Sequence, residues 1–446
     1  PAAEAGLQAG DIIMEINGKD MAQGDRTPNE LTSYVSDNLR GDPGTTCVLK
    51  LERPTADSTY IPMELKITRG TIRTNPVPYY GMVDKNIGYI AISTFAIEGC
   101  SKDIKKALIE LKQQGATSIV LDLRGNGGGL LSEAVNVVNF FVPKGKEIVV
   151  TKGKIKQAGS TYKTSNEPID MEIPLTVLVD GATASAAEIV SGSLQDLDRA
   201  VIVGNRTYGK GLVQVPRELP YNSSMKVTTA KYYIPSGRCI QAIDYAKRNA
   251  DGSVARIPDS LTTVFHTAAG REVRDGGGIR PDVEVKAERF PNIMFYLLND
   301  DMIFDYATQY CIKHPNIGEV KDFSVTDADY DDFKQMLKKR NFTYDRQSEK
   351  SLKNLKEIAE FEGYMEGASE EFAALEKKLT HNLDHELNRF SKQIRKAIAE
   401  EIVKRHYFQR GVILERMKDD ADLTKAIETL KDKEGYTKIL SVPADK

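Results

Sequence analysis

A serine and a lysine in two separate segments have the surroundings that hydrolytic chemistry needs. Ser185 lies in ATASAAEI, and Lys210 lies in RTYGKGLVQ, where Gln214 closes the segment. A serine hydroxyl is nearly inert at neutral pH unless a neighbour removes its proton, most often a histidine and sometimes an uncharged lysine. The two residues therefore suggest a nucleophile with an amine base.

The elements around Ser185 are expected to present it at the start of a helix. Residues 174–180, PLTVLVD, form an apolar, β-branched run typical of a buried strand, and AAEIVSGSLQDL after Ser185 has helical character. A helix N-terminus offers unpaired backbone N–H groups and the positive end of the helix dipole. These groups would stabilise an oxyanion at an attacked carbonyl, and the N–H of Ala186 is the nearest donor.

Lys210 follows the strand-like segment AVIVG and opens a second one, KGLVQV. Alternate residues of a strand share a face, so we expect Lys210, Leu212 and Gln214 on one side, where Gln214 can hold the lysine amine. A lysine base must be uncharged, and desolvation among apolar neighbours is the usual cause. The alternative is an exposed lysine beside a turn, which the combination with serine and glutamine disfavours.

A glycine-rich loop is the third feature. Residues 119–123 are expected to form a strand that leads into GNGGG at 125–129 and then into an amphipathic helix. A dinucleotide-binding loop would need glycine where the chain has Leu130, and no Gly-Lys-Ser/Thr follows for a Walker loop. What remains is a backbone loop that binds an oxyanion or a peptide, or a plain tight turn.

These segments, in this order, resemble the carboxy-terminal processing, or tail-specific, peptidases, which are serine endopeptidases with a Ser/Lys dyad. That family carries a DLR-x-N-x-GG loop, an S/T-A-S-A-S/A-E nucleophile turn and a T-F/Y-GKG-x-V-Q segment, all present here. The resemblance implies Ser185 as nucleophile, Lys210 as general base and Gln214 as the residue that orients the lysine.

The same resemblance implies an oxyanion hole made of backbone N–H groups. These would come from Ala186 and from the glycine loop, at Gly129 or Gly128. Two downstream family motifs are also present, YY-x-P-x-GR-x-I-Q at 232–241 and G-I-x-PD at 278–282.

The amino-terminal stretch PAAEAGLQAGDIIMEINGKDM is similar to the helix–turn–strand signature of a PDZ domain. Residues 27–30, TPNE, are typical of a capping box, residues 31–39 would carry one apolar helix face, and residues 47–51 alternate as a strand. The strand and loop that capture a peptide carboxylate would precede Pro1. We therefore expect a PDZ domain whose N-terminal part is missing, with tail recognition implied by the resemblance.

The chain of 446 residues suggests about three domains at the usual 100 to 200 residues each. We expect the truncated PDZ domain over 1–72, the Ser/Lys peptidase core over 73–290 and an all-α C-terminal domain over 291–446. From Gly88 onward strands and helices alternate in βαβ fashion, which predicts the α/β class. The resemblance implies a crotonase-like core.

An apolar stripe in the last domain predicts one long helix of about nine turns. It would serve as a scaffold arm or a dimer or adaptor interface, or it would pack within its own domain. The stripe consists of Phe372, Leu375, Leu379, Leu383, Leu387, Phe390, Ile394, Ile398 and Ile402.

No metal or cofactor is expected. His381, Asp384 and His385 approach the H-x-x-E-H pattern of zinc peptidases, but Asp replaces Glu, and both histidines fall opposite the apolar stripe. Neither His266 nor His406 lies near the serine in sequence, so a Ser/His triad is unsupported.

Whole-chain composition excludes several classes. With 61 basic and 64 acidic residues and a net charge of −3, the chain has no bulk attraction to nucleic acid or anionic membranes, and it has no apolar run long enough to span a bilayer. Cys47, Cys100, Cys239 and Cys311 are scattered and are expected to be buried free thiols. Location in the bacterial periplasm or cell envelope rests on the family resemblance.

The expected function is cleavage of polypeptides near their C-termini through an acyl-enzyme on Ser185, with Lys210 as general base. One alternative is a non-catalytic module on the same fold that binds a peptide or a lipophile, and the joint presence of serine, lysine and glutamine argues against it. The other is an acyl-CoA enzyme with a crotonase-type oxyanion hole, which needs neither this dyad nor a PDZ domain.

Overall fold

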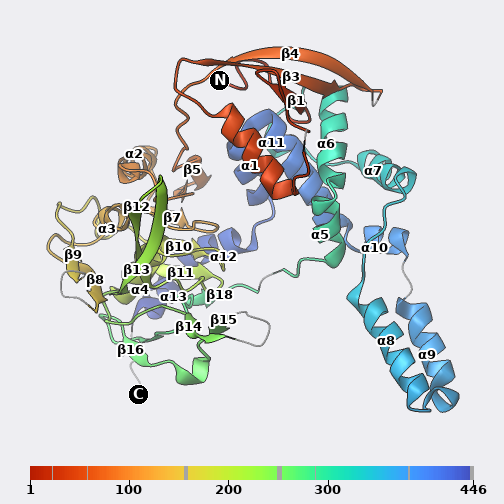
Figure 1. Cartoon of the computed structure of the whole chain (residues 1–446). Coiled ribbons are helices and arrows are strands. Elements are labelled where there is room, and N and C mark those ends of the chain that lie inside the picture. The colour runs from red at the N-terminus through yellow and green to blue at the C-terminus, as the bar shows by residue number, and fades with distance from the viewer. Residues whose placement is uncertain are drawn as a thin grey trace. The chain divides into compact units, whose positions relative to one another are not determined.

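The computed structural model describes residues 1–22, 24–57, 59–154, 159–248, 254–286, 288–379 and 382–441. Two compact units can be distinguished (Figure 1). One unit comprises Pro1–Ile72 with Glu288–Lys418, and the other comprises Arg73–Ala287 with Asp419–Lys446. The last segment of the predicted helical domain therefore packs with the peptidase core, and the PDZ part forms one unit with the remaining helices.

The PDZ part is a four-stranded sheet with one helix. Its elements are β1 (Ile12–Ile16), β2 (Lys19–Asp20), α1 (Pro28–Leu39), β3 (Thr46–Pro54) and β4 (Tyr60–Thr68). The strand order is β2-β1-β3-β4, and all pairs are antiparallel.

The local predictions for this part are confirmed except at one position. Thr27 and Glu30 form the predicted capping box at the start of α1. Residues 47, 49 and 51 alternate inward and are buried, as a half-buried strand requires. Val35 and Leu39 pack against the small core below the helix, whereas Leu31 is exposed, so the apolar face of α1 is shorter than predicted.

The peptidase core is built on a six-stranded sheet with strand order β18-β11-β10-β7-β6-β5. Its elements in chain order are β5 (Tyr79–Asp84), β6 (Ile87–Ala91), α2 (Cys100–Gln113), β7 (Ser118–Asp122), α3 (Leu131–Val138), β10 (Leu175–Val179), α4 (Ala186–Asp196), β11 (Val201–Gly204) and β18 (Val283–Glu284). All strand pairs except β5–β6 are parallel, so a crossover must connect successive strands, and helices α2, α3 and α4 lie in these crossovers. The predicted alternation of strands and helices is thereby confirmed as a mixed α/β fold.

A second, antiparallel sheet lies in the same unit. It has the order β12-β13-β8-β9. Its strands are β8 (Glu147–Gly153), β9 (Ser160–Lys163), β12 (Leu212–Leu219) and β13 (Ser223–Tyr233). Two small hairpins and a short helix follow: β14 (Ile243–Arg248) with β15 (Val254–Arg256), η2 (Asp259–Leu261), and β16 (Val264–His266) with β17 (Glu272–Arg274).

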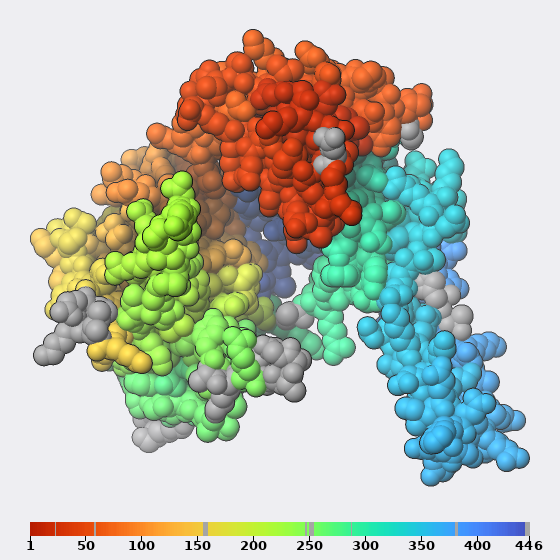
Figure 2. All heavy atoms as spheres, viewed as in Figure 1, coloured from red at the N-terminus to blue at the C-terminus, as the bar shows by residue number. Residues whose placement is uncertain are grey.

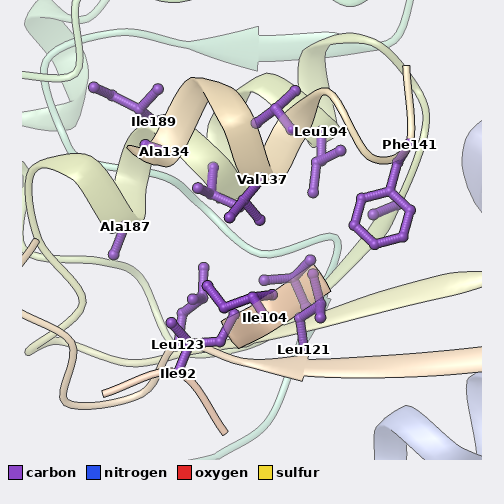
Figure 3. Packing of buried hydrophobic residues seen from close by; sticks show 14 of the residues in the cluster. Ile92, Ile104, Leu121, Leu123, Ala134, Val137, Phe141, Ala187, Ile189 and Leu194 are labelled. Carbon is purple, nitrogen blue, oxygen red and sulfur yellow. The ribbon is translucent and has the colours of Figure 1, made fainter. Parts of the chain in front are cut away.

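The main sheet is covered on both faces by helices from different parts of the chain. On one face Ile104 of α2, Val137 of α3 and Ala187 of α4 gather with Leu121 of β7 (Figure 3). Successive residues of a strand point to opposite faces, so Val120, the neighbour of Leu121, faces the other way, and it is equally buried. On that second face α12 (Ala421–Lys431), followed by α13 (Lys433–Leu440), packs against β7, β10 and β11.

The predicted nine-turn helix is wrong, because the stripe is divided among three helices. These are α9 (Met365–Leu379), α10 (Leu383–Arg389) and α11 (Ser391–Met417). Leu387, Ile394, Ile398 and Ile402 are fully buried in the core of their own unit, so this part of the stripe serves internal packing. Phe408 has non-helical backbone angles and kinks α11.

The remaining helices of this unit are α5 (Asn292–Asn299), α6 (Met302–Lys313), η3 (Val320–Asp322), α7 (Asp327–Lys339) and α8 (Gln347–Phe361). Figure 2 shows α8 and α9, in light blue, standing clear of the other helices of their unit. Apolar side chains such as Leu355, Phe361 and Leu375 are exposed there. Among the described residues, no helix has the length and the apolar composition that crossing a membrane requires.

Candidate active site

Three loops carry the predicted site residues, and each follows the carboxyl end of a strand in the main sheet. The glycine loop (residues 123–130) follows β7, the serine turn (residues 180–185) follows β10, and the lysine loop (residues 205–211) follows β11. These three strands are parallel neighbours, so their carboxyl ends lie at one edge of the sheet. Open parallel sheets commonly bind ligands at this edge.

Ser185 lies at the N-cap of α4, as the sequence predicts. Its backbone has φ 56° and ψ −117°, which is rare for a residue with a side chain and marks a sharp, strained turn. The side chain is half-buried. Ser185 is therefore both the last residue of the serine turn and the residue from which α4 starts.

Glu188, one turn into α4, connects the serine turn with the lysine loop, and its side chain is fully buried. Its Oε2 accepts hydrogen bonds from the backbone N–H of Ser185 and of Lys210, both at 2.8 Å. Its Oε1 accepts from the Thr207 hydroxyl at 2.5 Å and from the Gly209 N–H at 2.7 Å. Burial raises the pKa of Glu188, and the four donors act in the opposite direction.

Tyr232 connects the backbones of Ser185 and Lys210 through their carbonyl groups. Its hydroxyl lies 2.8 Å from the carbonyl oxygen of Lys210 and 3.2 Å from that of Ser185. The ring is buried, and burial raises the pKa of the phenol well above its usual value, so the hydroxyl stays a donor. Glu188 and Tyr232 therefore hold the backbones of the predicted nucleophile and the predicted base beside each other.

Ser185 and Lys210 are connected through their backbone groups, which share Glu188 and Tyr232 as hydrogen-bond partners. Among the described residues, no hydrogen bond connects the Ser185 hydroxyl with the Lys210 amine. The Lys210 side chain is half-buried. The structure thus brings the backbones of the two residues together.

Gln214 does not make the predicted contact with Lys210. Its side chain is exposed, and its amide donates a weak hydrogen bond of 3.5 Å to the Thr228 hydroxyl. The reason is local: β12 starts only at Leu212, and the register between β12 and β13 shifts between Val213 and Gln214. The shift leaves one extra residue in β13, directly after Thr228, and Lys210 lies before β12, so the alternation on which the prediction depended does not reach from Gln214 to Lys210.

The glycine loop lies against the serine turn. Gly128 has φ 96°, and a Cβ atom there would lie 2.8 Å from the Ser185 Cβ. Gly129 has φ 148°, and a Cβ atom there would lie 2.1 Å from the carbonyl carbon of Phe95. Both positions therefore require glycine, because the backbone angle and the space forbid a side chain.

The structure discriminates between the two predicted glycine donors. The N–H of Gly128 already donates to Oδ1 of Asn126 at 2.9 Å. Within the described ranges, no hydrogen bond uses the N–H of Gly129 or that of Ala186, which is the first residue of α4. The geometry favours Gly129 and Ala186 as oxyanion donors and disfavours Gly128.

A main-chain contact and a side-chain contact connect the glycine loop with the serine turn. Asn126 is fully buried, and its carbonyl accepts from the N–H of Ala184 at 2.9 Å, directly before Ser185. Asp180 accepts at 3.0 Å from the N–H of Gly125 and from that of Ala182. The two loops are therefore one hydrogen-bonded structure.

None of the described histidines and cysteines is hydrogen-bonded to Ser185, Lys210 or Glu188. His381 is outside the described residues, and His385 and His266 are exposed. Across the described part of the chain, no three His, Cys, Asp or Glu side chains are grouped to hold a metal ion. Burial raises the pKa of the Cys100 thiol to about 12 and that of Cys311 to about 11, so both stay protonated at neutral pH.

The cysteine prediction is confirmed in part. All four cysteines are free, Cys47 and Cys100 are buried, and Cys239 and Cys311 are half-buried.

Sequence reasoning missed Glu188, Thr207 and Tyr232. A carboxylate three residues after Ser185, within the apolar stretch AAEIV, is a detectable signal, because a buried acid needs donors. Thr207 and Tyr232 carry no such signal, since only the fold brings them to Glu188 and to the two carbonyl groups.

Comparison with known proteins agrees with this geometry. Residues 86–247 match peptidase family S41, residues 1–53 match a PDZ domain, and residues 293–430 match the C-terminal helical domain of a probable PDZ-protease. The chain belongs to peptidase family S41, whose relatives include the carboxy-terminal processing peptidases.

Three similar proteins illustrate the relationship. The carboxy-terminal-processing protease of Bartonella bacilliformis is 39% identical over 249 residues, which are 54% of this chain and 54% of that protein. The carboxyl-terminal-processing protease of Picosynechococcus is 38% identical over 238 residues, covering 53% and 54%. A solved photosystem II D1 C-terminal processing protease is 30% identical, covering 66% of this chain and 67% of that one, with a TM-score of 0.36. The chain spans about half the length of the curated relatives it matches.

Proposed function

We propose that this protein is a serine endopeptidase that forms an acyl-enzyme on Ser185 with Lys210 as general base. The observation that carries the proposal is that one carboxylate oxygen of Glu188 accepts the N–H groups of both residues at 2.8 Å. A nucleophile and its base must be adjacent for proton transfer, and this oxygen together with the Tyr232 hydroxyl fixes their backbones side by side.

The reaction begins when an extended segment of a polypeptide places its scissile carbonyl at Ser185. The uncharged Lys210 amine takes the hydroxyl proton while the Ser185 oxygen bonds to the carbonyl carbon. The lysine then gives this proton to the departing amine as the C–N bond breaks. A water molecule, deprotonated by the same lysine, attacks the acyl carbon. The lysine then returns the proton to the Ser185 oxygen as the ester C–O bond breaks, which releases the new carboxyl terminus and free Ser185.

The carbonyl oxygen becomes negatively charged in both attack steps and needs donors that are already in place. We assign this role to the backbone N–H groups of Ala186 and Gly129. Ala186 begins α4, so the positive end of the helix dipole adds to its N–H. The strained backbone of Ser185 supports the assignment, since strain of this kind is concentrated at functional sites.

The substrate class and location follow from the relatives by analogy. The names of the similar proteins support processing of polypeptides at their C-termini, and the PDZ part supports recognition of a chain end. The same analogy supports a crotonase-like description of the core and location in the bacterial periplasm or cell envelope. Dimerisation or adaptor binding through the helical part belongs to the same set of hypotheses.

The test is digestion of unfolded casein by the wild type and by Ser185→Ala and Lys210→Ala. Each substitution should lower kcat by about 10³-fold or more, because the residues act as one unit. Lys226→Ala, on an exposed part of β13, is the matched control and should retain wild-type turnover. Wild-type-like turnover in either dyad variant would refute the assignment, and no digestion by the wild type would favour a non-catalytic binding module.

A further inference from the structure

The C-terminal segment 419–441 covers the second face of the peptidase sheet. The buried side of α12 is formed by Leu423, Ala426 and Leu430, and the helix packs against β7, β10 and β11. In α13 the Tyr436 hydroxyl lies 3.0 Å from the N–H and 3.1 Å from the carbonyl oxygen of Leu175 in β10. The segment thus lies directly on the strands that carry the three site loops.

Arg124, in the glycine loop, is the point where this segment reaches the site. Its guanidinium donates to Asp420 at 2.9 and 2.7 Å and to Asp422 at 3.1 Å, both at the start of α12. It also donates to Asp122 at the end of β7, at 2.6 Å for the shortest contact. Paired, bidentate contacts of this kind fix direction as well as distance.

The cluster is enclosed, so its charges are poorly screened by solvent. The side chains of Arg124 and Asp420 are 21% and 8% exposed. Burial acts to lower the pKa of Arg124, but Asp122 and Asp420 outweigh it and raise that pKa. Tyr89 donates at 2.6 Å to Oδ2 of Asp122, the oxygen that also accepts the shortest contact from Arg124. Loss of the Asp420 and Asp422 carboxylates would leave the Arg124 guanidinium paired, among the described residues, with Asp122 alone and free to move from its present position.

A short chain of bonds connects Arg124 with the reacting groups. Arg124 and Asn126 lie in one tight turn of the glycine loop. The Asn126 side chain accepts from the N–H of Gly128, and its backbone carbonyl accepts from the N–H of Ala184, next to Ser185. A shift of Arg124 therefore displaces both the oxyanion side of the site and the residue before the nucleophile.

We propose that Asp420 and Asp422 of the C-terminal segment act through Arg124 as positioning residues that hold the glycine loop in its catalytic conformation. The proposal rests on the peptidase function proposed above. It assigns the start of α12 a role in transition-state stabilisation and not in substrate binding, because the N–H of Gly129 is needed only when the oxyanion forms.

The test compares full-length protein carrying both Asp420→Asn and Asp422→Asn with the wild type. Asn caps a helix as well as Asp, so α12 keeps its N-cap while the carboxylates are lost. We expect kcat on casein-derived peptides to fall about tenfold or more with KM within about threefold, because only the geometry of the reacting groups changes. Lys431→Ala is the matched control, since Lys431 pairs with Asp84 from the other end of α12, and it should keep wild-type kcat.

Amide hydrogen exchange gives a readout that does not depend on activity. In the double variant, exchange should speed up about tenfold or more in residues 124–130 while α12 stays protected. Unchanged kcat, or unchanged exchange in 124–130, would overturn the proposal. If the wild type digests no peptide, the peptidase assignment fails, and faster exchange in 124–130 still decides whether the C-terminal segment holds the loop.

Discussion

The serine turn and the glycine loop form two sides of the same site, but they are held by different parts of the chain. The serine turn is braced by Glu188, Thr207 and Tyr232, which all lie within the segment that also carries the base. The glycine loop is held through Arg124 by Asp420 and Asp422, from the far end of the chain. The comparison shows that the backbones of Ser185 and Lys210 are held by contacts within the core, whereas the glycine loop has, besides its bonds to the serine turn, contacts with a helix from the far end of the chain.

The largest effect on the serine turn is expected from Glu188→Gln. Each carboxylate oxygen accepts two donors, so an amide nitrogen at either place would face two N–H or O–H groups and leave them unsatisfied. We expect a loss of about 2 to 5 kcal/mol in the free energy of unfolding and a fall of about 100-fold in kcat. Urea denaturation and steady-state kinetics measure the two effects.

Glu133→Gln is the matched control for Glu188→Gln. Glu133 is also a buried glutamate, but its carboxylate accepts the N–H groups of Gly99 and Ser101 at the start of α2. This control should lose stability and keep kcat within about twofold at temperatures where it is folded. If Glu188→Gln and Glu133→Gln lower kcat equally, the effect of Glu188→Gln is general destabilisation, and the hydrogen bonds of the Glu188 carboxylate have no specific effect on catalysis.

A smaller effect is expected from Tyr232→Phe, which removes one hydroxyl and keeps the buried ring. The carbonyl groups of Ser185 and Lys210 lose their shared donor, so kcat should fall about tenfold with little change in KM, and stability by about 1 kcal/mol. Tyr233→Phe, at the next residue, should behave like the wild type. Wild-type kcat in Tyr232→Phe would show that Glu188 alone holds the two backbones.

The smallest effect is expected from Gln214→Ala. The amide is exposed and makes only a 3.5 Å contact with Thr228, so kcat should change less than about threefold. Arg217→Ala, further along the same strand, is the control. A fall in kcat near that of Lys210→Ala would restore the orienting role that the family resemblance implies, and it would require the lysine loop and the start of β12 to rearrange in the working enzyme.

Much of the local structure was predictable because it depends on short-range patterns. The capping box at Thr27, the strands at 119–123 and 174–180, and the helix after Ser185 all follow from periodicity and end signals. The expected contact of Gln214 with Lys210 is absent among the described residues, because strand alternation requires both residues to lie in one strand and β12 begins only at Leu212.

The division of the chain into units was less predictable. The helical composition after 291 looked uniform, yet α12 and α13 pack with the peptidase sheet, and the earlier helices form a unit with the PDZ part. An amphipathic helix shows which face it buries but not the surface that accepts it. The prediction of one long helix was wrong for a related reason. The three- and four-residue spacing of the apolar side chains continues across the helix ends at Leu379 and Arg389, so the spacing alone does not show where a helix stops.

The sequence by itself determined the candidate reacting groups: a serine at a strand-to-helix turn, a lysine between glycines and a loop that only glycine can build. Residue type and short spacing suffice for this, because they set backbone freedom, helix ends and acid–base capacity. Only the tertiary structure decided what holds these groups in place, namely Glu188 and Tyr232 across the serine turn and Asp420 and Asp422 on Arg124. Those contacts join residues far apart in the chain, and no local preference specifies which buried charge meets which donor.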